Sequence, residues 1–399
     1  MRKIFVLRGP AYSGKTTFIT KHRLEPFTIS LNSFYPGIRE LDACGRWVDV
    51  DLEKRLRNTL LEEIQDRMNR GETIFIDGRN LKLKDINFYR NIADKNRYEL
   101  AIINFTATLE QMLDWNSNKP EWGKMTKKEI TEEYELMQSV VLPDELHTEM
   151  RIRLTPVAED FNQYDEVVHI GDVHGCIYPL FDALGCGKFG KGLKPNTAYV
   201  FTGDLLDKGP ENVETFQFFA SIAGAPNVYL IEGNHDTKLW NWAAGVNTAG
   251  DEEFQRTISE LTLAGITKNA VKNLCKKMKT HLCYTFNGNV FFCTHGGIPR
   301  IPEDLVCVPA CQLIKGVGRY DTAKFVDNMF EKIYAGKNLY SIHGHRNNEH
   351  SPTNVNSRCF NLNGDVENYG AIRRLTVNKE GFYINTFELE DSFTYKKAV

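Results

Sequence analysis

The sequence predicts an α/β protein with two domains, and three observations support this prediction. The chain has 399 residues, 42% of them hydrophobic and 25% charged, which is an ordinary globular composition with enough residues for two cores. Up to about residue 150, strand-like apolar runs alternate with helix-like stretches. A second series of strand-like runs follows, and potential metal ligands stand at the end of each of its five predicted core strands. Alternation of this kind is typical of parallel sheets covered by helices.

The first series predicts a parallel sheet with helices on both faces. A long helix is expected over residues 52–70, and the expected strands cover residues 4–7, 27–31, 73–76 and 100–105. The second series predicts core strands at residues 166–170, 198–202, 227–232, 289–294 and 339–342, and three more short strands within residues 358–388. A polar stretch at residues 155–164 separates the two, so we assign the domains to residues 1–152 and 163–399.

Charge and apolar patterning narrow the possible cellular setting. A net charge of −3 and a pI near 6.4 mean that any nucleic acid must be bound by local basic clusters. The apolar run after the first three residues is too short for a signal segment, and no long apolar stretch follows. The nine cysteines include no C-x-x-C pair and are expected to be reduced thiols. We therefore expect a cytoplasmic protein without a membrane partner.

A phosphate-binding loop begins directly after the first predicted strand. The segment GPAYSGKT, residues 9–16, matches G-x-x-x-x-G-K-[ST] and leads into a predicted helix. In such loops the backbone N–H groups hold a polyphosphate, the lysine reaches the β- and γ-phosphates and the hydroxyl ligates magnesium. The motif predicts a site for ATP or GTP with magnesium, made by Gly9, Ser13, Gly14, Lys15, Thr16 and Thr17.

Two further residues are candidates for the same site. Asp77 ends a predicted strand, where ligands of open α/β sheets gather, so it could contact the acceptor or a magnesium-bound water. A turn or helix-capping aspartate is the alternative. Residues 109–136 could form a lid, and within it Lys119 is the candidate for neutralising charge on the transferred phosphoryl group. The other lysines of this segment fit a solvated helix equally well.

The polar ends of the second series of strands have the composition of a binuclear metal centre. The segments are GDVHG (171–175), GDLLDKG (203–209), GNHD (233–236), THG (294–296) and HGH (343–345). Two metals about 3.5–4 Å apart need a shared carboxylate, and imidazole, carboxylate and amide donors suit manganese, iron, zinc or nickel. We predict Asp204 as the bridge, with Asp172, His174, Asn234, His295 and His345 completing the ligands. Spacing alone leaves His343 open as the alternative to His345.

The neighbours of these ligands predict phosphate ester hydrolysis. Two metals can activate water for in-line attack on phosphorus and neutralise the phosphate oxygens. His235 follows the ligand Asn234 and could protonate the leaving oxygen, while Asp207 holds its imidazole. Lys208 would grip the phosphate.

These motifs resemble those of the calcineurin-like binuclear metallophosphatases: D-x-H, G-D-x-x-D-R-G, G-N-H-[DE], H and G-H. The match covers most of residues 166–350 and implies a two-sheet α/β sandwich with His345 as the ligand. Two positions depart from the family. Lys208 stands where arginine is usual, which keeps the charge but loses the bidentate fork. Arg346 stands where close relatives usually have threonine.

The order of the two domains resembles the bacterial polynucleotide kinase-phosphatases, without the ligase domain that follows in them. FIDGRNL, GNHDTKLW and NLNGDVENYGAIRRL are similar to segments of that family. The resemblance implies ATP-dependent phosphorylation of 5'-OH ends and metal-dependent removal of 2',3'-cyclic, 3'- or 2'-phosphates, with manganese the leading metal. The implied partners are RNA ends, with DNA open, and a separate nucleic-acid ligase. The oligomeric state stays open, a homodimer included.

The kinase half departs from that family at its acceptor strand. An aspartate base and an arginine three residues later are usual, whereas this chain offers Asn32 or Ser33, then Tyr35 or Pro36. Trp115 also stands where a lid arginine is usual. Three alternatives remain: a kinase that is slower or has its base moved to Asp42, Asp49 or Asp51, with Arg39 serving the acceptor; a nucleotide kinase; or a domain that binds without transfer.

A different substrate class is the alternative for the whole chain. Protein phosphatases and dinucleoside polyphosphate hydrolases have nearly the same metal motifs. In that case the phosphate-binding loop would belong to a regulatory nucleotide-binding domain.

Overall fold

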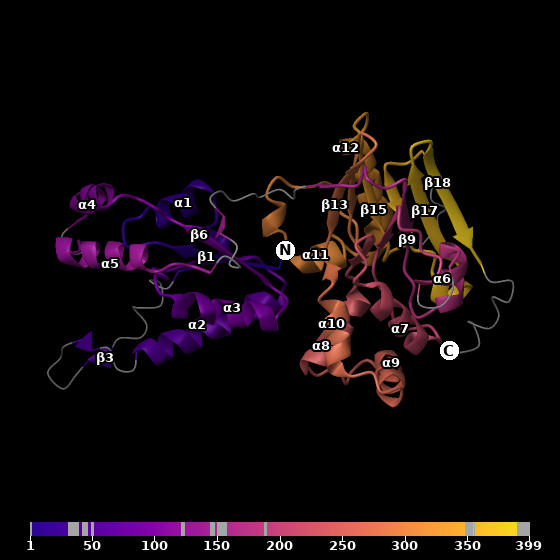
Figure 1. The fold of residues 1–399 in the computed structure, drawn as a ribbon, viewed down its shortest axis with the longest axis horizontal. Coiled ribbons are helices and arrows are strands. Elements are labelled where there is room, and N and C mark those ends of the chain that lie inside the picture. The colour runs from indigo at the N-terminus through magenta and orange to yellow at the C-terminus, as the bar shows by residue number, and fades with distance from the viewer. Residues whose placement is uncertain are drawn as a thin grey trace. The chain divides into compact units, whose positions relative to one another are not determined.

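The computed structural model describes residues 2–30, 40–41, 47–48, 52–120, 124–143, 148–149, 158–186, 190–347, 354 and 356–388. The chain forms two compact units (Figure 1), which are described separately. Unit 1 comprises Met1–Thr155 and Glu303–Ala310, and unit 2 comprises Pro156–Pro302 and Cys311–Val399. Eight candidates for the acceptor site lie outside the described residues: Asn32, Ser33, Tyr35, Pro36, Arg39, Asp42, Asp49 and Asp51.

Unit 1 contains the predicted parallel sheet. Its five strands are arranged in the order β2-β5-β1-β6-β7, all parallel, and cover Thr28–Ser30 (β2), Ile74–Asp77 (β5), Lys3–Arg8 (β1), Glu99–Asn104 (β6) and Thr148–Glu149 (β7). The register pairs Leu7 with Asp77 and Ser30 with Asp77. The carboxyl ends of β1, β2 and β5 therefore meet where the phosphate-binding loop begins. A separate pair of short strands covers Glu40–Leu41 (β3) and Trp47–Val48 (β4).

Helices cover both faces of this sheet, as predicted. On one face α2 (Leu52–Asn69) and α3 (Leu83–Lys95) pack through Leu60, Ile64 and Ile86 on the inward side chains of β1 and β5. Figure 1 shows both helices below the sheet and α1 (Lys15–Lys21) above it. The remaining elements of residues 1–155 are a 3₁₀ turn at Glu25–Phe27 and the helices α4 (Leu109–Ser117) and α5 (Lys127–Ser139).

A segment from late in the sequence completes the second face of this sheet. Val306 and Cys307, in the 3₁₀ turn Leu305–Cys307, are buried beside Phe5, Leu7 and Ile19. The Thr73 hydroxyl donates to the Val306 carbonyl, and the Ala310 N–H donates to the Gly71 carbonyl at 2.8 Å. The predicted boundary puts residues 303–310 in the second domain, whereas the structure puts them in unit 1, because nothing local in eight residues indicates which core they enter.

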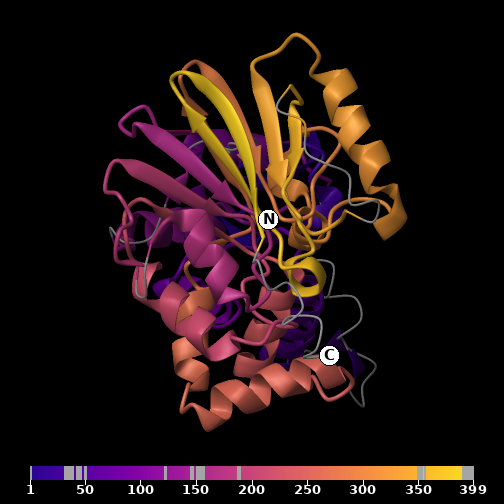
Figure 2. The same cartoon turned by 90° about the vertical axis from the view of Figure 1, so that its right-hand side faces the viewer.

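Unit 2 contains the predicted two-sheet sandwich (Figure 2). The first sheet has the order β12-β11-β10-β9-β17-β18, with Met278–Lys279 (β12), Val228–Ile231 (β11), Thr197–Phe201 (β10), Glu166–Ile170 (β9), Ile372–Asn378 (β17) and Gly381–Phe387 (β18). The second has the order β16-β15-β14-β13-β8, with Cys359–Asn361 (β16), Leu339–His343 (β15), Asn289–Cys293 (β14), Leu282–Phe286 (β13) and Glu159–Asp160 (β8). β13 is not among the predicted strands, although the turn Asn287-Gly288 that joins it to β14, with φ of 49° and 75°, is a typical hairpin signal.

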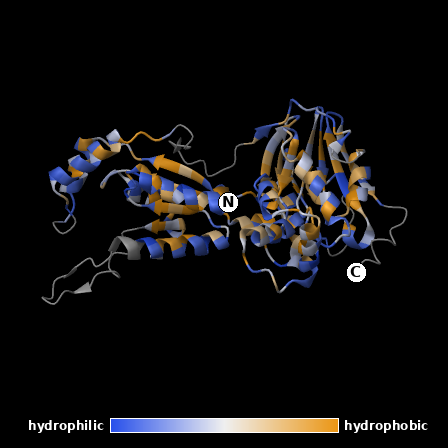
Figure 3. Cartoon of the chain, turned by 60° about the horizontal axis from the view of Figure 1, so that its bottom comes forward, coloured by the Kyte–Doolittle hydropathy of each residue, from blue (hydrophilic) through white to orange (hydrophobic). Residues whose placement is uncertain are grey.

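Alternation along the strands gives unit 2 two apolar layers. Val167 on β9 and Val200 on β10 face Tyr284 and Phe291 of the second sheet. Val168 and Ile170, which alternate with Val167 along β9, face the helices. The helices of this unit are α6 (Ile177–Leu184), α7 (Asn212–Ile222), α8 (Asn234–Ala244), α9 (Glu252–Leu263), α10 (Lys268–Cys275), α11 (Ala310–Ile314), α12 (Ala323–Ile333) and α13 (Val366–Tyr369), with a 3₁₀ turn at Tyr320–Thr322. Figure 3 shows hydrophobic residues on the strands of the sandwich. Every helix in the described part of the chain is too short or too polar to cross a lipid bilayer.

Candidate functional site

Side chains from the ends of four strands of unit 2 converge on Asp204. Two groups of potential metal ligands, His174–Asp204–His235 and Asp204–His295–His345, each have donor atoms within 4.8 Å of one another. Asp204 is common to both groups, which is the geometry of the predicted bridging carboxylate. β9, β10 and β11 are parallel, and so are β14 and β15, so residues far apart in the chain arrive at shared sheet edges.

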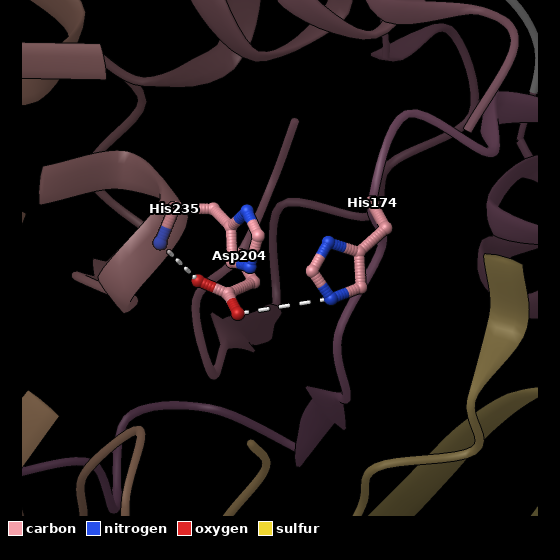
Figure 4. Close-up of side chains that lie close together, drawn as sticks. All are labelled: His174, Asp204 and His235. Carbon is pink, nitrogen blue, oxygen red and sulfur yellow. Dashed lines mark hydrogen bonds and ion pairs between the residues drawn. The ribbon is translucent and has the colours of Figure 1, made fainter. Parts of the chain in front are cut away.

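The two carboxylate oxygens of Asp204 contact different partners. Oδ1 accepts the backbone N–H of His235 at 2.8 Å, and Oδ2 lies 3.7 Å from His174 Nε2 (Figure 4). Oδ2 also lies 3.0 Å from His295 Nε2, which is 3.2 Å from Asn234 Oδ1. Asn234 begins α8, so the strand end after β11 delivers both this amide and His235.

Two glycines are required for the carboxylates to reach these positions. Asp172 accepts the backbone N–H of His345, with 3.1 Å from N to Oδ2. A Cβ on Gly344 would lie 1.9 Å from Asp172 Oδ1, and a Cβ on Gly233 would lie 2.1 Å from Asp204 Oδ1. The glycines of the G-N-H and G-H motifs are therefore explained by close approach of a carboxylate to the backbone.

Left-handed backbone conformations are concentrated among the predicted site residues. In the described part of the chain eleven residues other than glycine have positive φ, and five of them are His174, Asp204, Asp207, Lys208 and His345. Such conformations cost free energy and persist where the surrounding structure enforces them, as at functional sites. The turns after β9, β10 and β15 therefore have strained backbone conformations, which direct the side chains of these residues toward the cluster.

Buried carboxylates and imidazoles crowd this cluster. Burial and the charge of Asp204 raise the pKa of Asp172 to about 6 and that of Asp236 to about 7. Burial opposes protonation of His295, but Asp204 and Asp172 raise its pKa to about 9. Asp236, to which the sequence analysis gave no role, accepts the backbone N–H of Asp204 at 2.9 Å. Its signal was its place in G-N-H-D.

The donor atoms fit a pair of divalent metal ions. The six predicted ligands supply only carboxylate, imidazole and amide donors, which suit such ions, and cations would relieve the repulsion between Asp172 and Asp204. His295 Nδ1 donates to the Thr202 carbonyl at 2.8 Å, which leaves Nε2 free to coordinate. Nδ1 of His174 is buried and has no hydrogen-bond partner among the described residues.

The structure separates the two histidines that spacing left open. His343 Nε2 lies 3.0 Å from Asp327 Oδ1, on α12, and His343 is fully buried there. His345 is the one whose ring lies in the group with Asp204 and His295. His343 thus forms a separate group with Asp327 and Cys359, which joins α12 to β15 and β16, and His345 belongs to the cluster around Asp204.

The proposed proton donor has the partner that the sequence predicts. His235 Nδ1 lies 2.7 Å from Asp207 Oδ2, and Asp207 Oδ1 accepts the Thr257 hydroxyl at 2.7 Å. Burial opposes ionisation of Asp207, but these two hydrogen bonds lower its pKa to about 2. The anionic carboxylate holds the proton on Nδ1 and leaves Nε2 for proton transfer.

Lys208 carries an ion-pair partner that the sequence analysis did not identify. Its Nζ lies 2.5 Å from Glu367 Oε1 and 3.4 Å from His174 Nε2. Glu367 lies on α13, within the NLNGDVENYGAIRRL segment whose similarity was noted without a role for this residue. Lys208, the residue predicted to bind the phosphate, and a carboxylate therefore lie together at one edge of the cluster.

Arg346 has a structural role. It is buried, and its guanidinium donates to the Val317, Arg319 and Gly296 carbonyls, each at 3.0 Å. It thus connects the turn after β14 to residues 317–319. The departure from threonine at this position stabilises loops and adds no group to the cluster.

In unit 1 the lysine of the phosphate-binding loop forms hydrogen bonds within the loop itself. Lys15 Nζ donates to the Gly9 and Pro10 carbonyls at 2.6 and 2.7 Å and lies 3.3 Å from Ser13 Oγ. Burial lowers the pKa of Lys15 to about 8. Gly14 has a φ of 96°, a conformation that residues with a side chain rarely adopt. Thr16 and Thr17 lie exposed on the first turn of α1.

The predicted neighbours of this loop are placed differently. Asp77 is buried at the end of β5, accepts the Ser30 hydroxyl at 3.0 Å and acts electrostatically on Lys15. Lys119 lies exposed in the turn after α4. Asp77 is thus beside the loop lysine, whereas Lys119 makes no described contact with the loop.

An ion pair that the sequence analysis missed also reaches this loop. Arg79 Nε lies 2.6 Å from Glu133 Oε1, and Glu133 Oε2 accepts the Ala11 N–H at 2.8 Å. The backbone carbonyl of Arg79 accepts the Gly9 N–H at 3.1 Å. FIDGRNL contains Arg79, but nothing local in the sequence links it to α5.

Comparisons with known proteins give a separate family model for each part of the chain. The model of the calcineurin-like phosphoesterase family matches residues 166–366, and a model of an AAA domain matches residues 4–141. Two bis(5'-nucleosyl)-tetraphosphatases PrpE [asymmetrical] are similar: that of Halalkalibacterium halodurans is 33% identical over 97 residues (23% of this chain, 39% of the relative), and that of Oceanobacillus iheyensis is 30% identical over 143 residues (33% and 56%).

The serine/threonine-protein phosphatase PP2A-like PPG1 of Candida albicans is 27% identical over 154 residues, 38% of this chain and 32% of the relative. The chain thus spans between about a third and just over half of the length of these curated relatives. The family model covers half of the chain, including the cluster around Asp204. The chain belongs to the calcineurin-like phosphoesterase family.

Proposed function

We propose that this chain heals nucleic-acid ends: unit 1 phosphorylates a 5'-OH with ATP or GTP, and unit 2 removes a 2',3'-cyclic, 3'- or 2'-phosphate. One observation carries the proposal. A phosphoesterase cluster with its own His235–Asp207 pair shares a chain with a phosphate-binding loop whose lysine lies by Asp77. Enzymes that add phosphate at one end and remove it at the other need both. RNA is the proposed substrate, with DNA as the alternative, and a separate ligase would join the processed ends.

In unit 2 the chain's own residues bind, orient and transfer a proton. Two divalent ions, manganese first and nickel, iron or zinc next, would be held by Asp172, His174, Asp204, Asn234, His295 and His345 and would supply Lewis-acid chemistry and an activated water. Lys208 orients the phosphate. His235 gives the proton from Nε2 to the leaving ribose oxygen while Asp207 retains the Nδ1 proton.

In unit 1 the backbone of residues 9–16 would hold the nucleotide phosphates, with Thr16 on magnesium. Lys15 must leave the Gly9 and Pro10 carbonyls to reach the β- and γ-phosphates. Asp77, at the end of β5 and acting electrostatically on Lys15, is the carboxylate that we propose for orienting an acceptor hydroxyl. Phosphoryl transfer depends mainly on positioning and charge, so we expect this set to support transfer at a reduced rate.

The decisive test uses one RNA with a 5'-OH and a 2',3'-cyclic phosphate. Incubation with radiolabelled ATP and manganese should label the 5' end and convert the cyclic end to a hydroxyl. Lys15→Ala should abolish only the labelling, and Asp204→Ala only the phosphate removal. Absence of labelling on RNA and DNA would reject the kinase half, and untouched 3' ends would reject the phosphatase half.

Dinucleoside polyphosphate hydrolysis is the second candidate, favoured by the similarity of this chain to the two tetraphosphatases. Diadenosine tetraphosphate should then be cleaved with a kcat/KM well above that for cyclic-ended RNA. The same comparison with a phosphopeptide tests the protein phosphatase alternative.

A further inference from the structure

The cation that would grip the phosphate in unit 2 is already paired with a carboxylate. Lys208 Nζ lies 2.5 Å from Glu367 Oε1, and this oxygen is 3.8 Å from His174 Nε2. Glu367 Oε2 is buried and has no hydrogen-bond partner among the described residues. A carboxylate with an unused oxygen therefore stands at the edge of the cluster where the phosphate would be bound.

The backbone holds Glu367 in this place. It lies on α13, where Asp365 and Gly370 flank the helix with φ of 57° and 70°, and Val366 is fully buried. The Asp365 N–H donates to Asn363 Oδ1 at 2.7 Å. The backbone that carries this carboxylate is thus held by a tight turn between β16 and β17 and by the buried Val366.

A carboxylate here discriminates between kinds of phosphate ester. A monoester dianion has three unesterified oxygens that share two negative charges, and an oxygen bound by Lys208 would lie next to Glu367. In a phosphodiester one of these oxygens carries carbon and has no charge, so repulsion by Glu367 is weaker. Paired with Glu367, Lys208 adds little net positive charge, although it still donates hydrogen bonds.

We propose that Glu367 is a specificity-determining residue that favours phosphodiesters, such as 2',3'-cyclic phosphates, over phosphomonoesters. The inference rests on the proposed phosphatase function of unit 2 and deepens it by naming the ester class. Removal of its charge should raise the affinity for dianions and leave that for monoanionic diesters nearly unchanged.

The test compares wild type, Glu367→Gln and the control Glu380→Gln with 2',3'-cyclic AMP and 3'-AMP. Glu380 lies in the turn between β17 and β18, near the amino end of β9, so its change removes the same charge at the opposite edge of the sheet from the cluster. We expect Glu367→Gln to raise the kcat/KM ratio of monoester to diester about tenfold and to bind inorganic phosphate about tenfold more tightly by calorimetry. Glu380→Gln should change neither value.

Three outcomes would overturn the proposal. An unchanged ratio with equal losses on both esters would give Glu367 a merely structural role. A loss of one metal equivalent in Glu367→Gln, measured by elemental analysis, would make it a ligand. A ratio that shifts equally in Glu380→Gln would indicate a general charge effect. If wild type hydrolyses neither ester, the proposed function of unit 2 fails, which is a separate result.

Discussion

The two predicted phosphate sites of this chain are built in opposite ways. The loop of unit 1 is made by eight consecutive residues, and its lysine is satisfied by the loop's own carbonyls. The cluster of unit 2 is assembled from side chains between Asp172 and His345, and five of its residues have left-handed backbone. Backbone groups recognise phosphate locally, whereas a binuclear centre needs side chains that only a complete fold can bring together.

The electrostatics of the two sites differ in the same sense. Lys15 is a buried cation whose pKa is lowered to about 8, and a bound anion would stabilise its charge. Asp172 and Asp236 are buried carboxylates with raised pKa, and bound cations would stabilise their charged forms. The difference teaches that the two predicted sites bury opposite charges, a lysine in the loop of unit 1 and carboxylates in the cluster of unit 2.

The largest expected effect comes from the shared ligand. Asp204→Ala removes the residue common to both ligand groups, so phosphoesterase activity should fall roughly 10⁴-fold while 5' phosphorylation is unchanged. Metal content should fall from two equivalents, as measured by elemental analysis. Asp182→Ala, which removes an exposed carboxylate on α6, is the control and should retain both activities. Retained hydrolysis in Asp204→Ala would remove this residue from the centre.

The matching change in unit 1 should be smaller. Lys15→Ala removes one charge from a site otherwise made of backbone, so phosphoryl transfer should fall about 10³-fold. Hydrolysis by unit 2 should be unaffected, and Lys21→Ala at the exposed end of the same helix is the control. Equal loss of both activities would mean that the substitution unfolds the chain, which a melting curve would detect.

The proton donor can be tested by the choice of leaving group. His235→Asn should lower kcat about 10²- to 10³-fold for esters of ribose, whose leaving oxygen needs a proton. For p-nitrophenyl esters the loss should be below about tenfold, because nitrophenolate leaves without protonation. Equal losses on both substrates would assign His235 to metal or phosphate positioning instead.

A second buried histidine on β9 sharpens the contrast between structural and catalytic imidazoles. His169 Nδ1 donates to the Leu375 carbonyl at 3.0 Å, Nε2 accepts from the Tyr284 hydroxyl, and burial lowers its pKa from 6.5 to about 4. Between pH 6.5 and pH 4, His169 is protonated in the unfolded chain but not in the folded chain. The free energy of unfolding therefore falls as the pH falls from 6.5 to 4.

From this shift His169 accounts for about 3 kcal/mol of that loss. Urea denaturation in EDTA at pH 7 and pH 4.5 measures it. His169→Gln should be less stable at pH 7 and lose less on acidification. A difference between the two pH values equal to that of wild type would assign the acid sensitivity to other groups, such as the buried His174 and His345, whose pKa values are also lowered by burial.

The smallest effect concerns the carboxylate on the phosphate-binding loop. Glu133 accepts the Ala11 N–H that would face a phosphate, so Glu133→Gln should lower the Kd of ATP about two- to fivefold. Fluorescent nucleotide titration measures it, and Glu132→Gln, on the exposed side of α5, is the control. Weaker binding would instead mean that Glu133 positions Arg79 for the nucleotide.

Local patterns predicted most of the elements. The strand at Glu166–Ile170 and the start of the helix at Leu52 lie where alternation and apolar periodicity placed them. The misses have physical reasons: Glu367 reaches Lys208 across 159 positions, and residues 303–310 enter the core of unit 1 through contacts with Thr73 and Gly71. Neither is encoded in neighbouring residues.

By itself the sequence determined the chemistry available to this protein: a backbone cradle for polyphosphate, and oxygen and nitrogen donors at strand ends suited to two metals. Only the tertiary structure decided which donors meet. It turned His343 to Asp327 and His345 to Asp204, tied Lys208 to Glu367, and gave Arg346 a structural role. Local motifs specify donor types because side-chain chemistry is local. Partners depend on sheet order and burial, which the whole chain determines together.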